Sequence, residues 1–316
     1  MAAIGYLFTA AGYQYVGAGR KVYDSMWAMR QFFDRVEKKM PDVKINKLAF
    51  IGPQEELQKP ENGTIFNGAY QAGMFEVLKE KKVTPEQIMG FRSGELIAHA
   101  CAGTFEFEDA MAFIYRKNIL FKEALGSAQF SQLLINTLDT GKTAQVCGEI
   151  NRAVKCGITS YNSSDSATVA VESKLKEKVI EAFKKLGGSV IDLPYEELSG
   201  LYLFKEAADK LTAEFGEAIK NEVIKVDKPA FKMYSQVKGD MYDNAAEIKQ
   251  SLFNYLYLPS RNDLIIHNMM KNCINTFVEL GCGTFLGRLA RKADSGKRVL
   301  NTHDLAGIST AIKLAN

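Results

Sequence analysis

The sequence lacks any C-x-x-C pair, and its five cysteines among 316 residues are an odd number. These features argue against a disulfide framework and against a cysteine zinc site, and they favour a reducing cytoplasm. No apolar run reaches the length of a membrane span, so we expect no transmembrane segment. The N-terminal stretch MAAIGYLFTAAGYQ lacks a basic leader, which predicts a buried first strand rather than a signal peptide.

A dense basic stripe with interleaved aromatic residues is also missing, which argues against nucleic-acid binding. The 40 basic and 37 acidic residues give a net charge of +3, spread along the chain. A mild positive charge suits an acidic protein partner. With 47% hydrophobic and 24% charged residues the composition is globular, and the length suits one large domain with an insertion, or two domains. We find no internal repeat and no low-complexity tract.

Alternating apolar strands and amphipathic helices predict an α/β protein. Around residues 53–63 the chain is polar, and we expect a connecting segment there. The predicted strands of the first part are 4–10 and 83–89, and the predicted helices are 26–40, 64–78, 95–102 and 107–125. Further on, residues 273–292 have the pattern of a helix end, a strand, a glycine-rich turn and a helix. The turns at Gly12, Gly90 and Gly281 would meet at the carboxyl ends of the parallel strands, where ligands of such sheets bind.

The middle of the chain predicts a different unit. Strands are expected at 130–138, 157–161, 167–171 and 189–193, with helices at 142–154 and 173–186. This β-α-β-β-α-β order is that of a compact ferredoxin-like unit. We therefore expect a parallel-sheet, α/β-hydrolase-like body formed by residues 1–125 and 198–316, with an inserted ferredoxin-like small domain at 126–197.

The stretch GFRSG, residues 90–94, has the spacing of a nucleophile elbow between a strand and a helix. Such a turn exposes its central side chain, and the backbone N–H groups at the helix start stabilise an oxyanion. Gly90 and Gly94 permit the close approach of the two segments. The central residue is Arg92, however, and arginine has no nucleophilic lone pair at working pH.

Several stretches together resemble the malonyl-CoA:acyl carrier protein transacylase family, including the acyltransferases of fatty-acid and polyketide synthases. The stretch from Gly90, GFRSGELIAHACAGTFEFEDAMAFIYRKNILFKEA, is similar to that family's G-H-S-x-G-E elbow and following helices. Four more stretches resemble its N-terminal loop, its asparagine turn, the helix after its histidine and its C-terminal turn, and these are FTAAGYQYVGAG, SYNSS, KEAADKL and FVELGCGTFLGRL. The resemblance covers essentially the whole chain.

The resemblance implies an acyl transfer in which a serine takes the acyl group from CoA and passes it to the carrier protein's phosphopantetheine thiol. A histidine acts as base, and an arginine on the following helix holds the malonyl carboxylate. Here Arg92 stands at the serine position and Gly200 at the base position. The positions of three site glutamines and of the residue before the serine also differ, and they carry Ala11, Gly63, Tyr255 and Phe91. The resemblance keeps Arg116 as the carboxylate-binding arginine, with Asn162 and Gly94. Loss of nucleophile and base costs on the order of 10⁴–10⁶ in rate.

Several residues keep more than one interpretation. Arg92 closes the pocket by pairing with Glu196, Glu197 or Glu95, joins Arg116 in a two-arginine anion site, or extends into solvent. Ser93 is a cap or packing residue, or a displaced nucleophile. Arg116 binds a ligand carboxylate or forms a structural salt bridge.

Other residues are expected to be structural. His99, His267 and His303 fall outside the base position, and Cys101 and Cys282 are expected to pack. The lysine-rich helix at 173–185 is a solvated face or a docking surface for an acidic carrier protein.

The first hypothesis is therefore a catalytically inactive transacylase homologue that binds or scaffolds components of fatty-acid or polyketide biosynthesis. Its expected partners are an acyl carrier protein, a synthase component or an active homologue. Its expected ligand is CoA or malonyl-CoA, with no covalently bound cofactor and no metal. The alternatives are an acyltransferase that holds an anionic donor with Arg92 and Arg116, and residual malonyl transfer through Ser93.

Overall fold

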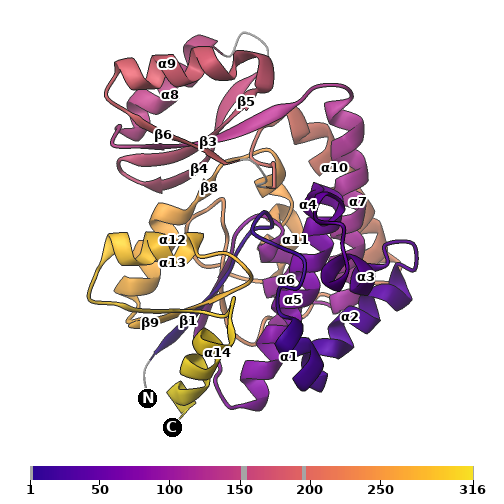
Figure 1. Cartoon of the computed structure of the whole chain (residues 1–316). Coiled ribbons are helices and arrows are strands. Elements are labelled where there is room, and N and C mark those ends of the chain that lie inside the picture. Colours follow the sequence, from indigo (N-terminus) through magenta and orange to yellow (C-terminus); the bar gives the residue numbers. More distant parts are fainter. Residues whose placement is uncertain (1–2, 151–154, 194–196, 316) are drawn as a thin grey trace.

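The computed structural model describes residues 3–150, 155–193 and 197–315, which form a large α/β body and a smaller unit above it in Figure 1. The body is built on a five-stranded sheet, ordered β10-β9-β1-β2-β7, in which every neighbouring pair is parallel. Its strands are β1 (Ile4–Phe8), β2 (Gln87–Gly90), β7 (Lys232–Tyr234), β9 (Thr276–Leu280) and β10 (Arg298–Asn301). This confirms the predicted α/β class with a parallel sheet.

The two faces of this sheet belong to two hydrophobic clusters, because successive side chains of a strand point to opposite faces. In β1, Tyr6 and Phe8 pack into the larger cluster and Leu7 packs into the smaller one. The smaller cluster is completed by α12 (Asn262–Lys271) and α13 (Phe285–Ala293). All five residues of β1 are buried, as expected for a central strand covered on both faces.

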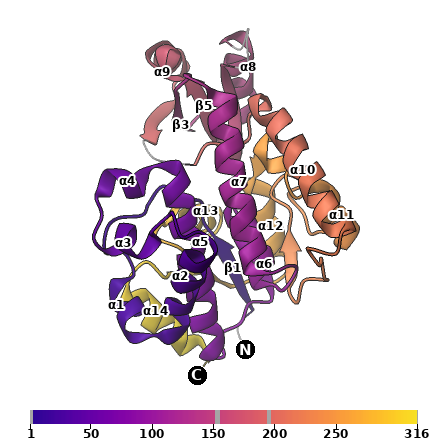
Figure 2. The same cartoon turned by 90° about the vertical axis from the view of Figure 1, so that its right-hand side faces the viewer.

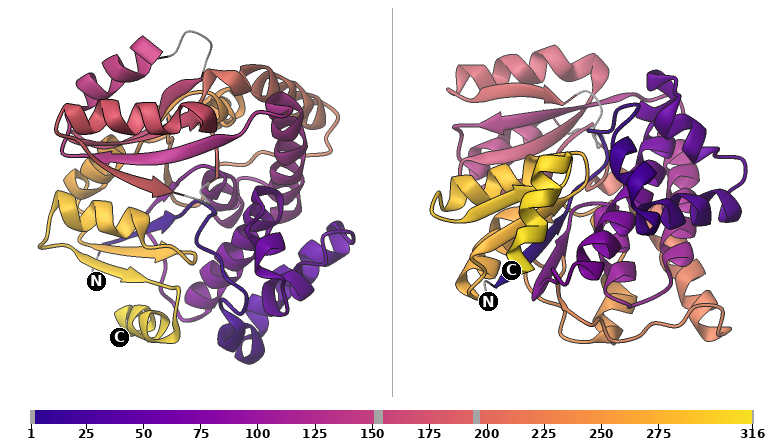
Figure 3. Two further views of the ribbon diagram at one scale, coloured as in Figure 1. Left: turned by 45° about the horizontal axis from the view of Figure 1, so that its top comes forward. Right: turned by 60° about the horizontal axis from the view of Figure 1, so that its bottom comes forward.

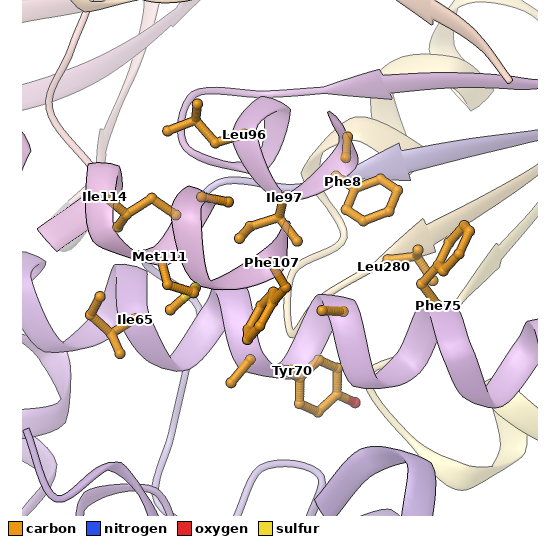
Figure 4. Packing of buried hydrophobic residues seen from close by; sticks show 14 of the residues in the cluster. Phe8, Ile65, Tyr70, Phe75, Leu96, Ile97, Phe107, Met111, Ile114 and Leu280 are labelled. Carbon is orange, nitrogen blue, oxygen red and sulfur yellow. The ribbon is translucent and has the colours of Figure 1, made fainter. Parts of the chain in front are cut away.

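The larger cluster surrounds α5 (Pro60–Glu80), which is buried without interruption from Gly63 to Phe75. A helix that is buried all round is typical of the interior of a large domain. Figure 4 shows Ile65, Tyr70 and Phe75 of this helix beside α6 (Gly94–Cys101) and α7 (Phe107–Leu125). The remaining helices of the body are α1 (Arg20–Ser25), α2 (Trp27–Lys39), α3 (Ile45–Phe50), α4 (Gln54–Gln58), α10 (Lys205–Lys220), α11 (Ala245–Ser251) and α14 (Leu305–Ile312).

The small unit contains the predicted element order. It comprises β3 (Phe130–Asn136), α8 (Thr140–Ile150), β4 (Cys156–Ser163), β5 (Ser166–Glu172), α9 (Lys176–Lys185) and β6 (Ser189–Leu193). Its strands lie in the order β6-β3-β5-β4 with antiparallel neighbours, which is the ferredoxin-like arrangement. Figures 1 and 3 show α8 and α9 on the face of this sheet that is turned away from the body. The predicted residues 151–154 of the first helix lie outside the described residues.

The two units are joined by more than the covalent connection. Figure 2 shows α7 running from the body up to the small unit. A short strand of the body, β8 (Ser260–Arg261), pairs in parallel with β4 and extends the small sheet. The small sheet therefore contains residues from outside the expected small domain at 126–197. Residues 260–261, which the sequence analysis assigned to the body, form its edge strand.

The polar stretch at 53–63 contains helix that the sequence pattern does not indicate. It holds α4 and the first turn of α5, which begins at Pro60. Proline is favoured at this first helical position because its missing N–H would have no helical partner there. Among the described residues, none of the helices is long and apolar enough to cross a membrane.

The glycine that starts α6 gives the first prediction. A Cβ at Gly94 would lie 2.5 Å from the carbonyl oxygen of Phe8 and 2.9 Å from that of Thr9. We therefore expect Gly94→Ala to lower the free energy of unfolding by at least about 2 kcal/mol, because β1 and α6 must move apart. Urea denaturation measures this loss.

The matched control is Gly216→Ala in α10, where a Cβ would meet nothing within 4 Å. Alanine there should raise the stability by about 0.5–1 kcal/mol, because it favours the helix. Equal effects of the two substitutions would contradict the close approach at Gly94.

Candidate functional site

The elbow is present as a sharp turn between β2 and α6. Arg92 has a φ of 56°, in the left-handed region that a bulky side chain rarely adopts. Gln236 holds this backbone from both sides. It accepts a hydrogen bond from the Arg92 N–H at 2.7 Å and donates one to the Arg92 carbonyl at 3.0 Å. A strained turn of this kind costs on the order of 1–3 kcal/mol and persists where its surroundings enforce it.

The side chain of Arg92 is fully buried and points into the junction of the two units. Its Nη2 donates to Oε1 of Gln132 on β3 at 2.7 Å, and its Nη1 donates to the backbone carbonyl of Glu197. The guanidinium also lies 4.8 Å from the ring centre of Phe91. The interpretation in which Arg92 extends into solvent is therefore wrong. The predicted pairing with Glu196 lies outside the described residues.

The carboxylate of Glu197 contacts two other groups. It accepts a hydrogen bond from Oγ of Ser93 at 2.6 Å and one from Nζ of Lys117 on α7. The side chains of Lys117 and Glu197 are each 2% exposed, so their ion pair is buried. Breaking a buried pair of this kind by removing one partner leaves an uncompensated charge. Ser93 is the N-cap residue of α6 but makes no side-chain capping bond, so of the expected capping or packing roles the structure shows a buried packing residue.

Arg116 does not enter this junction. It forms a surface ion pair with Glu214 of α10 at 2.8 Å, with its side chain 41% exposed. Successive helical residues differ in direction by about 100°, so Lys117 points inward where Arg116 points outward. The expected two-arginine site is therefore wrong, and the structural salt bridge is the interpretation of Arg116 that is confirmed. The inward cation is Lys117, which the sequence analysis missed.

A second buried carboxylate lies behind the elbow. Glu95 accepts hydrogen bonds from Nε2 of Gln236 at 2.6 Å and from the hydroxyl of Tyr242 at 2.8 Å. Burial raises the pKa of Glu95 to about 7, although the hydrogen bonds from Gln236 and Tyr242 act in the opposite direction. The predicted pairing of Glu95 with Arg92 is not made through the described contacts, since Gln236 lies between them.

With the geometry established, the chain can be compared with known proteins. No family model matches it. A malonyl CoA-acyl carrier protein transacylase of Bacillus subtilis (strain 168) is 26% identical over 317 residues, 99% of this chain and 97% of the relative. The corresponding protein of Haemophilus influenzae is 24% identical and covers 82% of both chains.

Solved structures agree with this comparison. A malonyl-transacylase in complex with its type II polyketide synthase acyl-carrier protein superposes with a TM-score of 0.90 at 23% identity, covering 99% of this chain and 100% of that one. FabD from Acinetobacter baumannii gives 0.90 at 19% identity, covering 99% and 98%. The chain resembles the malonyl-CoA:acyl carrier protein transacylases over its whole length. Its fold is that of these acyltransferases.

The glutamine positions expected from the transacylases are occupied by packing residues. Ala11 is buried, and its carbonyl accepts a hydrogen bond from the Glu197 N–H at 3.3 Å. A Cβ at Gly63 would lie 2.2 Å from Nε2 of Gln14, so Gln14 fills that space. The hydroxyl of Tyr255 is buried and has no hydrogen-bond partner among the described residues. Burial, and secondarily the charges of Glu197 and Glu95, raise the pKa of Tyr255 well above its ordinary value.

The histidine position of the transacylases is closed to a side chain. Gly200 has a φ of 78°, and a Cβ there would lie 2.9 Å from the carbonyl oxygen of Thr159. Its N–H donates to the Leu256 carbonyl at 2.8 Å. Asn162 is buried in the small unit, where its Nδ2 donates to Oγ1 of Thr168 at 3.1 Å and its Oδ1 accepts from Asn262 at 3.2 Å. These bonds join β4 to β5 and to α12, which is a structural role.

Among the described contacts, none of His99, His267 and His303 makes a hydrogen bond or ion pair with the elbow residues 90–94. His99 is buried, its Nδ1 lies 3.1 Å from Oγ1 of Thr104, and burial lowers its pKa to about 3. His303 lies 3.4 Å from a carboxylate oxygen of its neighbour Asp304. Cys282 packs at the edge of the larger cluster, and burial raises the pKa of its thiol to about 12, which disfavours a thiolate nucleophile.

Glu95 makes the stability depend on pH. Its pKa in the folded state is raised above its ordinary value of 4.5 to about 7, so the folded state holds a proton that the unfolded state has lost. Below pH 4.5 both states are protonated, and the free energy of unfolding therefore falls as the pH rises from about 4.5 to 7. The fall attributable to Glu95 is on the order of 3 kcal/mol.

We expect the free energy of unfolding of Glu95→Gln to fall less between pH 4.5 and 7 than that of the parent, because glutamine does not titrate. This expectation concerns the pH dependence and not the stability at any one pH. Urea denaturation at pH 5 and pH 7.5 measures the difference. The exposed substitution Glu217→Gln should keep the parent's pH dependence. If the free energy of unfolding of Glu95→Gln depended on pH as steeply as that of the parent, the pH dependence would come from other groups.

The closed histidine position gives a further prediction. We expect Gly200→Ala to lower the free energy of unfolding by at least about 1 kcal/mol more than Gly103→Ala. Gly103 has a similar φ of 74°, but a Cβ there would meet nothing within 4 Å. The two variants share the backbone strain, so their difference in thermal or urea denaturation measures the contact with Thr159. A histidine at position 200 would meet the same contact with Thr159. Equal losses of stability in Gly200→Ala and Gly103→Ala would show that position 200 has room for a side chain.

Proposed function

We propose that this chain is a catalytically inactive homologue of the malonyl-CoA:acyl carrier protein transacylases that acts as a binding or scaffolding component of fatty-acid or polyketide biosynthesis. The observation that supports this best is the buried guanidinium of Arg92, which fills the elbow between Gln132 and the Glu197 carbonyl. The central residue of the turn is not a nucleophile, and a Cβ at Gly200, the position expected for the base, would lie 2.9 Å from the Thr159 carbonyl oxygen.

An acyl carrier protein is the partner that this proposal favours. The structural neighbour with a TM-score of 0.90 is a malonyl-transacylase in complex with its carrier protein. The chain keeps the two-unit architecture of that protein, and its net charge of +3 suits an acidic partner. Loss of the chemistry with retention of the fold leaves recognition of the carrier, or of a synthase component, as the remaining activity.

A second function is favoured by one specific contact. The Ser93 hydroxyl lies 2.6 Å from a Glu197 carboxylate oxygen, within reach of a general base. Ser93 would then attack the thioester carbonyl, Glu197 would take its proton and the CoA thiol would leave. Against this, Ser93 is 2% exposed, and its carboxylate partner is already bound to Lys117.

Mass spectrometry distinguishes the two functions. The chain is incubated with malonyl-CoA and a holo acyl carrier protein, and both proteins are weighed. We expect no malonyl adduct on the chain and no transfer above the uncatalysed rate, whereas the Bacillus subtilis relative serves as the positive control. An adduct that disappears in Ser93→Ala would establish the second function, and an adduct that persists in Ser93→Ala would contradict both.

Carrier binding is measured separately, because inactivity alone does not make a scaffold. Calorimetric titration of the parent chain with the holo carrier protein should give a dissociation constant in the micromolar range or tighter, and it should weaken with rising salt. Absence of binding to carrier proteins and to synthase components would contradict the proposed scaffold.

A further inference from the structure

A pocket of about 430 Å³ lies directly beside the buried ion pair of Lys117 and Glu197. Both of these residues line it, together with the last turns of α7 and the residues that follow them. Its volume is within the range of small-molecule sites. Most of its lining is apolar, and the apolar side chains include Tyr115, Ile119, Phe121, Leu125, Ala128 and Leu198.

The charges around this pocket divide into a buried pair and an exposed pair. Glu61 and Lys122 also line it, but both are exposed, so water screens their charges. In the interior the Lys117 ammonium is compensated by the Glu197 carboxylate, and it lies 5.6 Å from the ring centre of Phe121. The buried wall is therefore neutral as a whole, although it contains a cation.

This neutrality decides which ligands the pocket favours. A ligand carboxylate that approaches Lys117 would compete with Glu197 for one ammonium, and two carboxylates would share a site of low dielectric. An uncharged chain meets no such repulsion and gains from the removal of apolar surface from water. Glu197 lines the pocket, and its carboxylate also accepts the hydrogen bond from the Ser93 hydroxyl.

We propose that this pocket binds the uncharged acyl chain of a pantetheine thioester, and that Glu197 excludes acyl groups that end in a carboxylate. The thioester class rests on the proposed function, and the apolar chain rests on the lining and charge of the pocket. Glu197 thus already compensates the Lys117 ammonium, which would otherwise be the buried cation available to a ligand carboxylate. The chain would recognise a carrier by an extended acyl group rather than by a malonyl group.

Calorimetric titration with two soluble probes, octanoyl-pantetheine and malonyl-pantetheine, tests this proposal. We expect the parent chain to bind the octanoyl probe at least tenfold more tightly than the malonyl probe. Glu197→Gln leaves the Lys117 ammonium without its counter-charge, so it should bind the malonyl probe at least tenfold more tightly than the parent does. Glu217→Gln is the matched control, because it removes an exposed carboxylate outside this pocket and should change neither affinity.

Two more variants keep the test decisive if Glu197→Gln is poorly folded. The double variant Lys117→Met with Glu197→Leu removes both buried charges, and it should keep octanoyl binding without gaining malonyl binding. Leu125→Trp should fill the pocket and abolish octanoyl binding while the circular dichroism spectrum stays that of the parent.

Three results would overturn the proposal: no octanoyl binding by the parent, tight malonyl binding by the parent, or folded Glu197→Gln without a gain for malonyl. These outcomes can be distinguished from a failure of the proposed inactivity. Binding is measured here without transfer, whereas the transfer assay detects an acyl adduct. Failure to bind the octanoyl probe would therefore not contradict the proposed lack of transfer activity. Detection of an acyl adduct on the chain would not contradict the proposed preference for the octanoyl over the malonyl probe.

Discussion

A single buried glutamate connects the large body, the small unit and the elbow. The carboxylate of Glu197 holds Ser93 at the start of α6 and Lys117 on α7, and its backbone carbonyl accepts from Arg92. Because a buried charge without a partner is costly, each of these groups depends on the others. Gln132 of the small unit donates to the same carbonyl at 3.2 Å, so the packing of the two units depends on this point as well.

The elbow persists although its central side chain no longer has the chemistry for which such turns are built. Its backbone is held by Gln236, which also accepts from Ser260 of β8 at 2.8 Å and donates to Glu95. The turn is therefore part of a hydrogen-bonded network that joins the segment after β7 to β8 and α6. Arginine in place of a small nucleophile fills the space above the turn and donates hydrogen bonds to the Glu197 carbonyl and to Oε1 of Gln132. These features make the elbow a structural element of the junction.

Sequence reasoning was most successful where periodicity is strong. The amphipathic helix at 107–125 and the last strand of the small unit, at 189–193, have the bounds that the pattern predicts. It was less successful in the polar stretch before α5, because a short helix with one exposed face has no long apolar period to detect. It also predicted the sharp turn around Arg92, because glycines at fixed spacing between a strand and a helix are a local signal.

The candidate site was predicted in part, and its errors have a common cause. Arg116 and Lys117 are adjacent in the sequence, and both are basic, so only the direction of each side chain on α7 shows which one is buried. Gln236 and Gln132 carry no motif, and they are recognised only because the fold brings the segment after β7 and strand β3 to the elbow.

By itself, the sequence determined the α/β class, the two-unit organisation, the elbow and the absence of a serine at its centre. These features follow from local patterns of apolar residues, glycines and residue type. Only the tertiary structure decided where the charges go: Arg92 into the junction, Arg116 to the surface, and Lys117 to Glu197, which lies 80 residues further along the chain. The reason is that a buried charge selects its partner by distance and desolvation, and neither can be read from separation in the sequence.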